Sequence, residues 1–451
     1  MGSRVPLALL ALALAAGLAA AEEPLQAEPL SLERALALAV RQNPELQAAQ
    51  DRVQAQAERV QATRRSSWPR LSATTGWTLS NDPAMVFAQK LGAGEFGADD
   101  FAIERLNAPD ALAHQTTTLS LQAPIDVFHR VRTQTAAQSA LQQVASSGVQ
   151  EGQAELRLRV ITAYWQAALA RRALAVTEKA LEGARAREAG IQERVAQGGA
   201  LRADLLRVRA RRRQREAELA GRRGDARSTA AVLSRLLGAP GDTVYLPDDP
   251  VPVPAPIAGG AAAWSARAAQ RASIEVARQR LEAARAGARG ENQGRLPELV
   301  VYGQVQDDRN AISHGSLSGV VGASLRWNAF DPTRGKRQAA AQAELRAAEH
   351  DLRAAADQAR LEVDLAWRQA LAARERHQAA SGGAEDGREA LRVVAERRQA
   401  GMATLTDELE TEAASLAAEL EEIQAAIGVV VADAALERAG GGGLAITEAQ
   451  R

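Results

Sequence analysis

The chain has 451 residues, and its 55 basic and 55 acidic residues give a formal net charge of zero. This balance produces no bulk field that would attract nucleic acid, so we expect no nucleic-acid partner. Hydrophobic residues make up 46% of the chain but aromatic residues only 3%. Such a composition is typical of long helices packed through small contacts rather than of ordinary globular domains.

Residues 1–21 have the features of a secretory signal peptide. Arg4 precedes the apolar run Leu7–Leu18, and three alanines then lead to Glu22. The run is too short for a membrane span, although a membrane anchor is the alternative interpretation. The sequence contains no cysteine, so neither a disulfide nor a cysteine-linked lipid can form. We therefore expect an exported, unlipidated mature chain.

Two helices are expected before the first strand. Within 31–41 the apolar residues fall on one helical face: Leu32, Ala35, Leu36, Ala39 and Val40. Asn43 and Pro44 end this helix and begin the next, with Asn43 as the cap and Pro44 at the first helical position. The second helix is expected to end before Trp68.

Alternating apolar and polar residues predict four strands, two in each half of the chain. In the strand 70–80 the odd positions hold Leu71, Ala73, Thr75, Trp77 and Leu79. The other strands are expected at about 116–126, 298–306 and 316–328. A long loop, 81–115, is expected within the first pair, and a short loop, 307–315, within the second.

Each strand pair is followed by a long helical hairpin. The segment 127–197 contains no proline and could extend roughly 100 Å as a helix, at about 1.5 Å per residue. It is expected to turn at the tip 198–200 and to return to about Leu237. The second hairpin is expected to run over 331–398, to turn at the tip 400–403 and to return to about Glu437. Two heptad series in this last helix predict coiled-coil packing: Leu409, Leu416, Ile423 and Val430, and Ala413, Leu420, Ile427 and Ala434.

The two halves therefore repeat one design, over 22–239 and 261–439. The proline- and glycine-rich segment 240–260 joins them, and the residues 440–451 are expected to form a disordered tail. The repeat is about 200 residues long, far longer than a solenoid period, which indicates a duplicated architectural unit.

The alternation within the strands favours a water-filled membrane barrel, in which one face meets lipid and the other meets the lumen. Trp77 and Trp327 lie near strand ends, where a membrane girdle of aromatic residues is expected. A soluble hairpin that caps a helical bundle is the alternative. Four strands cannot close a barrel and open edges are not tolerated in lipid, so several chains must share one. These arguments allow a dimer with eight strands or a trimer with 12.

The ordered set of features, found twice, resembles the TolC-like outer-membrane efflux proteins over nearly all of the mature chain. The features are the segment 30–35 leading to 43–46, both strand pairs, the motif 163–165 and the two glycine tips. The resemblance implies a mainly α-helical fold with a membrane β-barrel, in which a homotrimer builds a 12-stranded barrel and a long periplasmic helical tunnel. Many relatives carry a lipidated N-terminal cysteine, which is missing here, but the family also has unlipidated members.

The resemblance also implies a function and partners. It predicts a passive exit duct in the outer membrane, surrounded by outer-membrane lipid. The duct would serve a tripartite efflux system or a type I secretion system. A periplasmic adaptor, which belongs to the membrane fusion proteins, and an inner-membrane transporter would complete the system. A trimeric coiled-coil surface protein or adaptor without a pore is the rival, and the two strand pairs argue against it.

The hairpin tips are the first candidate site. They comprise Gly198, Gly199, Ala200 and Leu201 in the first half, and Gly401, Met402, Ala403 and Thr404 in the second. Glycine lets the chain reverse between antiparallel helices, and small neighbours leave room for another helical hairpin. The resemblance implies that the adaptor docks here, whereas the alternative is that the tips are only turns.

Asp407 and Glu410 are the candidate channel constriction. They lie three residues apart, and therefore on one helical face just beyond the second tip. Threefold symmetry would turn each into a ring of carboxylates that selects cations, and we expect mutual repulsion to raise the pKa of both. Relatives have stacked acidic rings here and an arginine and a tyrosine that complete a closing network. Ala403 and Arg398 stand in their place, which puts that network in doubt; the alternative is a solvated pair of helix charges.

No catalytic, metal or cofactor site is expected. The five histidines are scattered without ligand spacing, and we interpret them as surface residues: His114, His129, His314, His350 and His377. The arginine run between Arg207 and Arg215 is followed by two glutamates, which indicates a solvated helix face. The chain is therefore predicted not to be an enzyme.

Overall fold

The computed structural model describes residues 27–239, 243–252, 256–311 and 314–442. The chain divides into two compact units. The first unit contains the residues up to Gln50, Gly148–Ile274 and the residues from Ala355 onward, and the second contains Asp51–Ser147 and Glu275–Ala354. The expected signal peptide lies outside the described residues.

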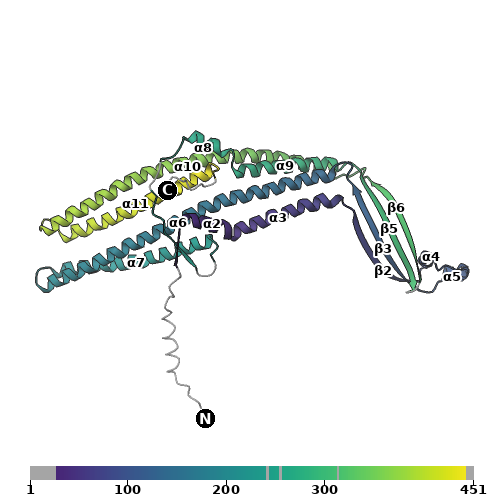
Figure 1. Cartoon of the computed structure of the whole chain (residues 1–451), viewed down its shortest axis with the longest axis horizontal. Coiled ribbons are helices and arrows are strands. Elements are labelled where there is room, and N and C mark those ends of the chain that lie inside the picture. The colour runs from purple at the N-terminus through teal and green to yellow at the C-terminus, as the bar shows by residue number, and fades with distance from the viewer. Residues whose placement is uncertain (1–26, 240–242, 253–255, 312–313, 443–451) are drawn as a thin grey trace, which may run out of the picture. The chain divides into compact units, whose positions relative to one another are not determined.

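The two halves of the chain use the same order of elements (Figure 1). The first half has the helices and strands α2 (Leu32–Gln42), α3 (Pro44–Arg64), β2 (Arg70–Ser80), β3 (Leu112–Ile125), α6 (Arg130–Ala196) and α7 (Arg202–Leu236). The second half has α8 (Ala261–Ala268), α9 (Ala272–Gln293), β5 (Glu298–Ala311), β6 (His314–Arg326), α10 (Arg334–Gln399) and α11 (Leu405–Ala439). The long helices α6 and α10 have 67 and 66 residues, and α7 and α11 have 35 each. This agreement in length matches the repeat in the sequence.

The first helices begin where the sequence provides caps. Ser31 caps α2, and its side chain accepts a hydrogen bond from the backbone N–H of Arg34. The Asn43 side chain accepts from the backbone N–H groups of Glu45 and Leu46, while its amide nitrogen donates to the carbonyl of Leu236 at 3.0 Å. Asn43 therefore joins α2, α3 and the end of α7.

In the second unit, four antiparallel strands form one sheet in the order β2-β3-β5-β6. Directly paired residues share a face, and the register places Ala73 beside Leu119, Leu119 beside Val305 and Val305 beside Gly319. The apolar odd positions of all four strands therefore meet on one face, and serine, threonine and glutamine line the other. Among the described residues, no helix combines the length and the apolar character that a membrane span requires.

Two strands are longer than the sequence indicated, and the expected loops are correspondingly wrong. β3 begins at Leu112 rather than near residue 116, and β5 continues to Ala311 rather than ending near 306. The sequence there loses its apolar alternation, but hydrogen bonds across the polar face hold the strands together: His114 and Thr116 both contact Asp308, at 3.0 Å each. The expected long loop also contains helices, α4 (Pro83–Gly92), η2 (Ala98–Phe101) and α5 (Ile103–Asn107).

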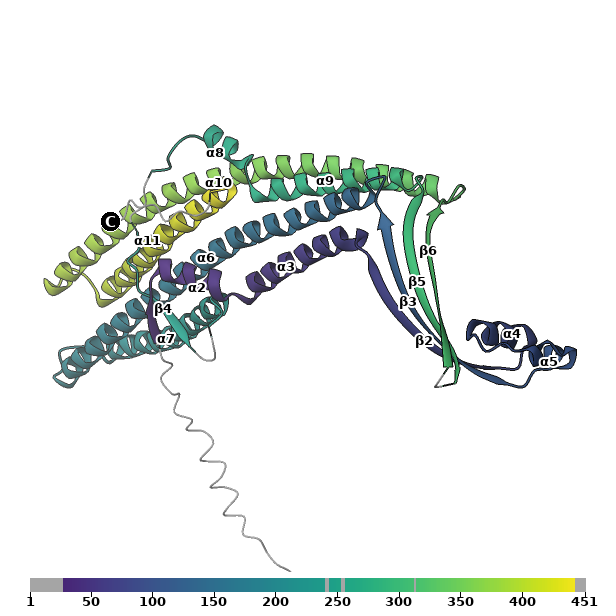
Figure 2. The ribbon, with the colours of Figure 1, turned by 45° about the vertical axis from the view of Figure 1, so that its right-hand side comes forward.

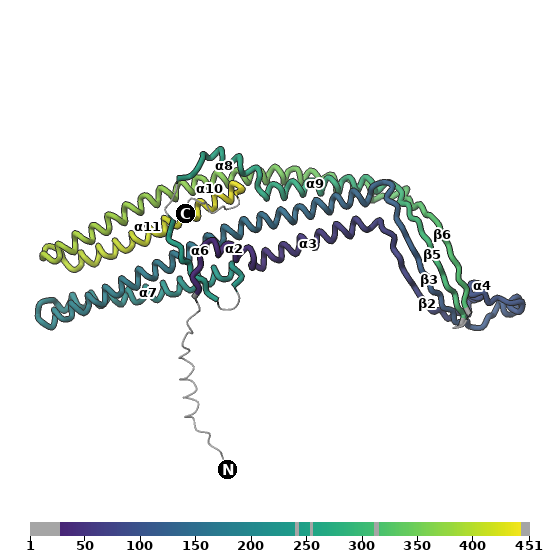
Figure 3. The backbone as a smooth tube through the Cα atoms, in the orientation of Figure 1, coloured from purple at the N-terminus to yellow at the C-terminus, as the bar shows by residue number. Residues whose placement is uncertain are grey.

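In the first unit, α6 runs beside α7, and α10 runs beside α11 (Figures 2 and 3). Small residues allow the second pair to approach closely. A Cβ atom at Gly387 would lie 3.3 Å from the Cα of Ser415, and Ala384 is fully buried. The alanine-rich composition thus provides close helix packing in place of a thick aromatic core.

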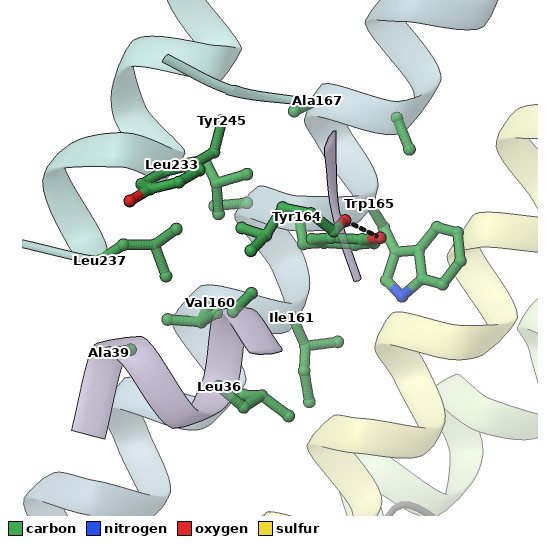
Figure 4. Close-up of a cluster of buried hydrophobic side chains, with 14 of the residues drawn as sticks. Leu36, Ala39, Val160, Ile161, Tyr164, Trp165, Ala167, Leu233, Leu237 and Tyr245 are labelled. Atoms are coloured by element: carbon green, nitrogen blue, oxygen red, sulfur yellow. Dashed lines mark hydrogen bonds between the residues drawn. The ribbon is translucent and has the colours of Figure 1, made fainter. Parts of the chain in front are cut away.

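The hydrophobic core of the first unit is centred on Tyr164 and Trp165 of α6 (Figure 4). The Tyr164 hydroxyl is 2.8 Å from both the carbonyl of Leu30 and the carboxylate of Asp249. Burial raises the pKa of Tyr164 well above its usual range. The core is closed by a parallel pair, β1 (Ala27–Leu30) with β4 (Val244–Pro247). The segment expected to be only a linker therefore contributes a strand, since Tyr245 is buried in this core.

The end of α11 is also anchored in the first unit. Arg271 is 4% exposed and pairs with Glu362 at 2.6 Å, while Arg438 pairs with Glu155 at 2.8 Å. A Cβ atom at Gly440 would meet the Trp264 ring at 2.6 Å. The expected tail is therefore wrong for Gly440–Gly442, whose N–H groups donate to the carbonyls of Leu436, Arg438 and Glu437 at the end of α11; residues 443–451 lie outside the described residues.

Candidate functional site

Both hairpin tips have the same backbone geometry. Gly198 and Gly401 each have a φ of +76°, in the left-handed region that glycine adopts without strain. At the first tip the N–H of Gly199 donates to the carbonyl of Arg194, at 2.7 Å; at the second, the N–H of Met402 donates to that of Arg397, at 2.8 Å. This is the Schellman arrangement that satisfies the last carbonyls of a helix. Glycine is therefore required at these turns by conformation alone.

Each tip has one large apolar side chain that is exposed. Leu201 is 70% exposed and Met402 is 73% exposed, while Ala200 and Ala403 are partly buried. A large apolar side chain at each tip is thus open to solvent in the isolated chain. Such residues are candidates for contact with a partner.

The structure gives Asp407 a capping role that the sequence analysis did not anticipate. Thr404 is the N-cap of α11, and its backbone N–H and its hydroxyl donate to Asp407 Oδ2, at 2.8 and 2.7 Å. The Asp407 N–H donates in turn to the Thr404 hydroxyl, which completes a capping box. These hydrogen bonds from Thr404 hold the pKa of Asp407 below its usual value. The single chain therefore shows no rise in the pKa of Asp407, and the rise expected within a ring of three chains stays a prediction.

Glu410 has a different environment from Asp407. It is exposed, and among the described residues it makes no hydrogen bond or ion pair. Three residues separate it from Asp407 on α11, so the two carboxylates share one helical face. Glu410 is therefore free to interact outside its own chain, whereas Asp407 has one carboxylate oxygen, Oδ2, held by Thr404.

An ionic cluster near the second tip was missed by the sequence analysis. Glu408 is buried and pairs with Arg398 of α10, and Arg187 of α6 pairs with Glu412 of α11 at 2.6 Å. Arg187 also lies 4.0 Å from Glu408. The cluster therefore links the first hairpin to the second. The sequence held no signal for it, because the burial of Glu408 is known only from the structure.

The two return helices have opposite charges. α7 contains 11 arginines and four acidic residues, whereas α11 contains nine acidic residues and one arginine. Part of the α7 charge is paired with α6, as Arg209 and Arg212 both bind Glu188, at 3.0 and 2.5 Å. The arginine run is thus a helix face with local ion pairs, as the sequence analysis expected.

The two tryptophans proposed for the girdle lie at opposite ends of the sheet. Trp77 of β2 pairs with Gln115, close to the end of the sheet that carries α4. Trp327 directly follows β6 at the other end, and its ring nitrogen donates to the carbonyl of Arg295 at 3.1 Å. Both side chains are exposed, as a residue that contacts lipid must be in a single chain. β2 and β6 are edge strands, each with one side unpaired within the described sheet.

Comparison with known proteins identifies the family. The sequence matches the outer membrane efflux protein family over residues 35–239 and 264–442. The chain belongs to this family. It is an outer-membrane efflux channel protein and not an enzyme, and the match covers both repeats. The coiled-coil surface protein without a pore, which was the rival, is thereby excluded.

The fold of this efflux protein is that of several solved channels. The outer membrane protein VceC from Vibrio cholerae is 18% identical with a TM-score of 0.71, covering 92% of this chain and 97% of its own. The CmeC outer membrane channel from Campylobacter jejuni is 14% identical with a TM-score of 0.75, covering 91% and 86%. The MtrE outer membrane channel from Neisseria gonorrhoeae is 19% identical with a TM-score of 0.71, and the match covers 92% of this chain and 89% of that one. No curated protein sequence matches the chain significantly.

Proposed function

We propose that the chain works as a homotrimer whose 12 strands close one barrel and whose long helices form a periplasmic tunnel. The observation that carries this proposal is the four-stranded sheet, with one apolar face, one polar face and two unpaired edges. In lipid, each edge must pair with another chain, because unsatisfied backbone groups are costly there. The apolar face then meets lipid and the polar face lines the lumen, with Trp77 and Trp327 in the two aromatic girdles.

The tunnel carries the proposed sites. The tips around Gly198 and Gly401 receive the helical hairpin of a periplasmic adaptor, which connects the duct to an inner-membrane transporter. Glu410 and Asp407 form acidic rings at the periplasmic entrance. The duct itself is passive, so substrate selection belongs to the transporter. The mature chain has no cysteine to lipidate and is held in the outer membrane by the barrel alone.

Purification of the full chain from outer membranes tests this proposal. We expect extraction only with detergent, a trimer by crosslinking, and ion conductance after insertion into planar bilayers. The matched control is a variant with prolines at Thr74 and Ser318, in the two edge strands, which should prevent strand pairing between chains. A monomer in the soluble periplasmic fraction, or a detergent-extracted trimer without conductance, would contradict the proposal.

A further inference from the structure

The charges of the sheet in the second unit are confined to its two ends. At one end, which we name the helical end, four segments join the strands to α3, α6, α9 and α10 (Figure 1): 64–70, 126–132, 291–298 and 326–337. At the other end, which we name the far end, lie the segment 81–111 and the end of β5, 307–311. The helical end has ten basic and four acidic residues, whereas the far end has three basic and eight acidic residues. The strand sequences between these segments contain no arginine, lysine, aspartate or glutamate, so the sheet is positive at one end and negative at the other.

Much of the positive charge at the helical end is not neutralised within the chain. Five of its basic side chains make no ion pair or hydrogen bond among the described residues: Arg64, Arg65, Arg130, Arg132 and Lys336. Arg337 differs, because it pairs with Asp331 at 2.6 Å. At the far end, by contrast, Lys90 pairs with Asp100 at 2.7 Å. The helical end therefore offers positive charge to a partner.

Aromatic side chains are exposed at the same end. Trp68, between α3 and β2, is 60% exposed, and Phe330, between β6 and α10, is 85% exposed. The guanidinium carbon of Arg65 lies 5.4 Å from the centre of the Trp68 ring, within the range of a cation–π interaction. A positive group and an apolar ring thus lie together on the surface before β2.

A second group of aromatic and basic residues follows β6. Trp327 is 63% exposed, and its ring nitrogen donates to the carbonyl of Arg295 at 3.1 Å. Arg334 donates to the carbonyl of Asn328, the residue after Trp327, at 2.8 Å. The two edge strands, β2 and β6, therefore both meet the helices through a tryptophan that has arginines close to it.

This combination of groups matches a layer of lipid headgroups. A tryptophan ring has an apolar body and a polar N–H, and it favours the boundary between acyl chains and water. A long basic side chain can bury its stem there and place its charge among the phosphates, where a guanidinium can donate two hydrogen bonds to one phosphate. A zwitterionic headgroup carries its own cation, so an anionic lipid gives the larger attraction.

We propose that the helical end binds anionic phospholipids in the periplasmic leaflet of the outer membrane. The inference rests on the proposed function, because the apolar face of the sheet meets lipid only in a closed barrel. That face leads directly into the helical end, since Leu325 on the apolar face of β6 is 66% exposed and lies two residues before Trp327. Arg70 and Arg326 lie on the polar face instead, and they belong to the lumen.

A second copy of the chain does not suit this surface. In a symmetric trimer the helical ends of all three sheets lie at one level, so each neighbour adds positive charge instead of neutralising it. Anionic phosphates between the chains relieve this repulsion. The far end has the opposite requirement, because its excess of acidic residues repels the same phosphates. The charge difference therefore also favours one orientation of the barrel in the membrane.

Lipid association with the full-length trimer tests the proposal. The trimer is reconstituted in phosphatidylcholine that contains a trace of spin-labelled phosphatidylglycerol or spin-labelled phosphatidylcholine, and electron spin resonance measures the immobilised fraction of each. We expect the anionic lipid to associate about 5-fold more strongly at low salt, because one basic residue near a membrane surface contributes about that factor. About 1 M sodium chloride should remove most of the difference. Equal association of both lipids at low salt would overturn the proposal.

Charge variants locate the binding at the helical end. The combination of Arg65→Gln, Arg295→Gln and Arg334→Gln removes three positive charges and should reduce the preference for phosphatidylglycerol to less than about 2-fold. Lysine at the same three positions keeps the charge and should retain most of the preference, which separates lost charge from lost packing. A preference that persists in the glutamine variant would contradict the assignment. The comparison of the two lipids on the wild-type trimer stays decisive if the glutamine variant fails to assemble.

The far end supplies a matched control. Lys90→Gln, Arg105→Gln and Arg309→Gln together also remove three positive charges, and they should leave the lipid preference unchanged. A loss as large as that in the helical-end variant would show that only the net charge of the chain matters, which rules out a site at the helical end.

Tryptophan fluorescence reports the position of the surface without any conductance. Phosphatidylglycerol brominated near the headgroup end of its acyl chains should quench the wild type, and Trp68→Phe with Trp327→Phe should weaken this quenching. Trp264→Phe, which replaces a buried tryptophan of α8, is the control. Quenching that is unchanged in the double variant would contradict the proposal. A trimer that conducts without a lipid preference contradicts only the lipid binding, and a chain that prefers phosphatidylglycerol but does not conduct contradicts only the channel.

Discussion

At the scale of single residues, Asp407 stabilises the N-terminus of its own helix, α11, whatever its role in a channel. Its carboxylate accepts two hydrogen bonds from Thr404, and its pKa is lowered for that reason. A group whose pKa is depressed by folding stabilises the fold above its unfolded pKa and loses that contribution as the pH falls through the folded value. We therefore expect the first turn of α11 to fray below about pH 4, measured by amide hydrogen exchange at residues 405–408. Asp407→Ala should show the same fraying at pH 7, and Asp407→Asn much less, because the asparagine side-chain oxygen can still accept from the Thr404 N–H.

A second prediction for this face of α11 concerns the charge of the proposed periplasmic entrance. Replacing Asp407 with Asn and Glu410 with Gln retains size and hydrogen bonding but removes both carboxylates. In planar bilayers this double variant should lose its preference for cations and its block by divalent cations. Glu410→Gln alone should cause most of the loss, because Glu410 makes no hydrogen bond or ion pair among the described residues. Unchanged selectivity in the double variant would show that these residues do not line the pore.

Residue patterns in the sequence could identify the two carboxylates but not how they differ. Spacing by three predicts a common helical face, and this holds for Asp407 and Glu410 in α11. The buried pair of Glu408 and Arg398 was not predictable, because burial of Glu408 depends on the approach of Arg187 from a helix more than 200 positions away in the sequence. The burial of His114 was missed for the same reason, as its partners lie on β5.

At the scale of elements, substitutions at the two hairpin tips can distinguish a role in turn formation from a role in docking. Valine at Gly198 or Gly401 must adopt a positive φ, which costs about 1–3 kcal/mol for a β-branched residue. A Cβ atom at either position has no neighbour within 4 Å, so we expect the trimer to assemble and export to fall. Alanine at Leu201 or Met402 keeps the turn and removes only the exposed side chain. If crosslinking to the adaptor is unchanged in all four variants, the tips are turns and nothing more.

The strands give a prediction with a built-in control. Ala73 and Val321 lie on the apolar face of the sheet, and Val321 is 84% exposed in the single chain. Arginine at either position would face lipid and cost about 2–4 kcal/mol near the middle of the bilayer, so assembly measured as heat-resistant trimer should fail. Arginine at Ser72 or Ser324, on the polar face, should be tolerated. Similar loss at all four positions would show that the faces are assigned wrongly.

Helices and strands were predictable where apolar residues recurred with a single helical or strand period. β2 occupies the expected residues 70–80, and the long helices match expectation to within a few residues. The period failed where polar residues replaced apolar ones on the apolar face of a continuing strand, as at Gln115 in β3 and Asp307 in β5. The short helices α4, η2 and α5 and the strand β4 were also missed, since α4 contacts β5 and β4 pairs with β1, both distant in the sequence.

At the scale of the whole molecule, the opposite charges of α7 and α11 predict a dependence on salt. Arg187 joins the hairpins through Glu412, and the attraction between them acts over a Debye length, which falls from about 10 Å at 0.1 M salt to about 3 Å at 1 M. We expect amide exchange near residues 198–208 and 401–412 to be faster in 1 M than in 0.1 M sodium chloride. Arg187→Gln should accelerate exchange at low salt and reduce the difference. Exchange rates that are independent of salt would contradict an electrostatic link.

The net charge of zero therefore conceals a polarity within each chain. A rod-like partner that touched both hairpins at once would be drawn to α7 by acidic groups and to α11 by basic ones. A partner with one kind of charge would be attracted to one of these helices and repelled by the other, so the two effects would cancel. Recognition would then favour a helix with an acidic edge and a basic edge, and it would also fix which way round that helix lies. The charges of α7 and α11, two helices of 35 residues each, would then set the orientation of the partner in the assembled complex.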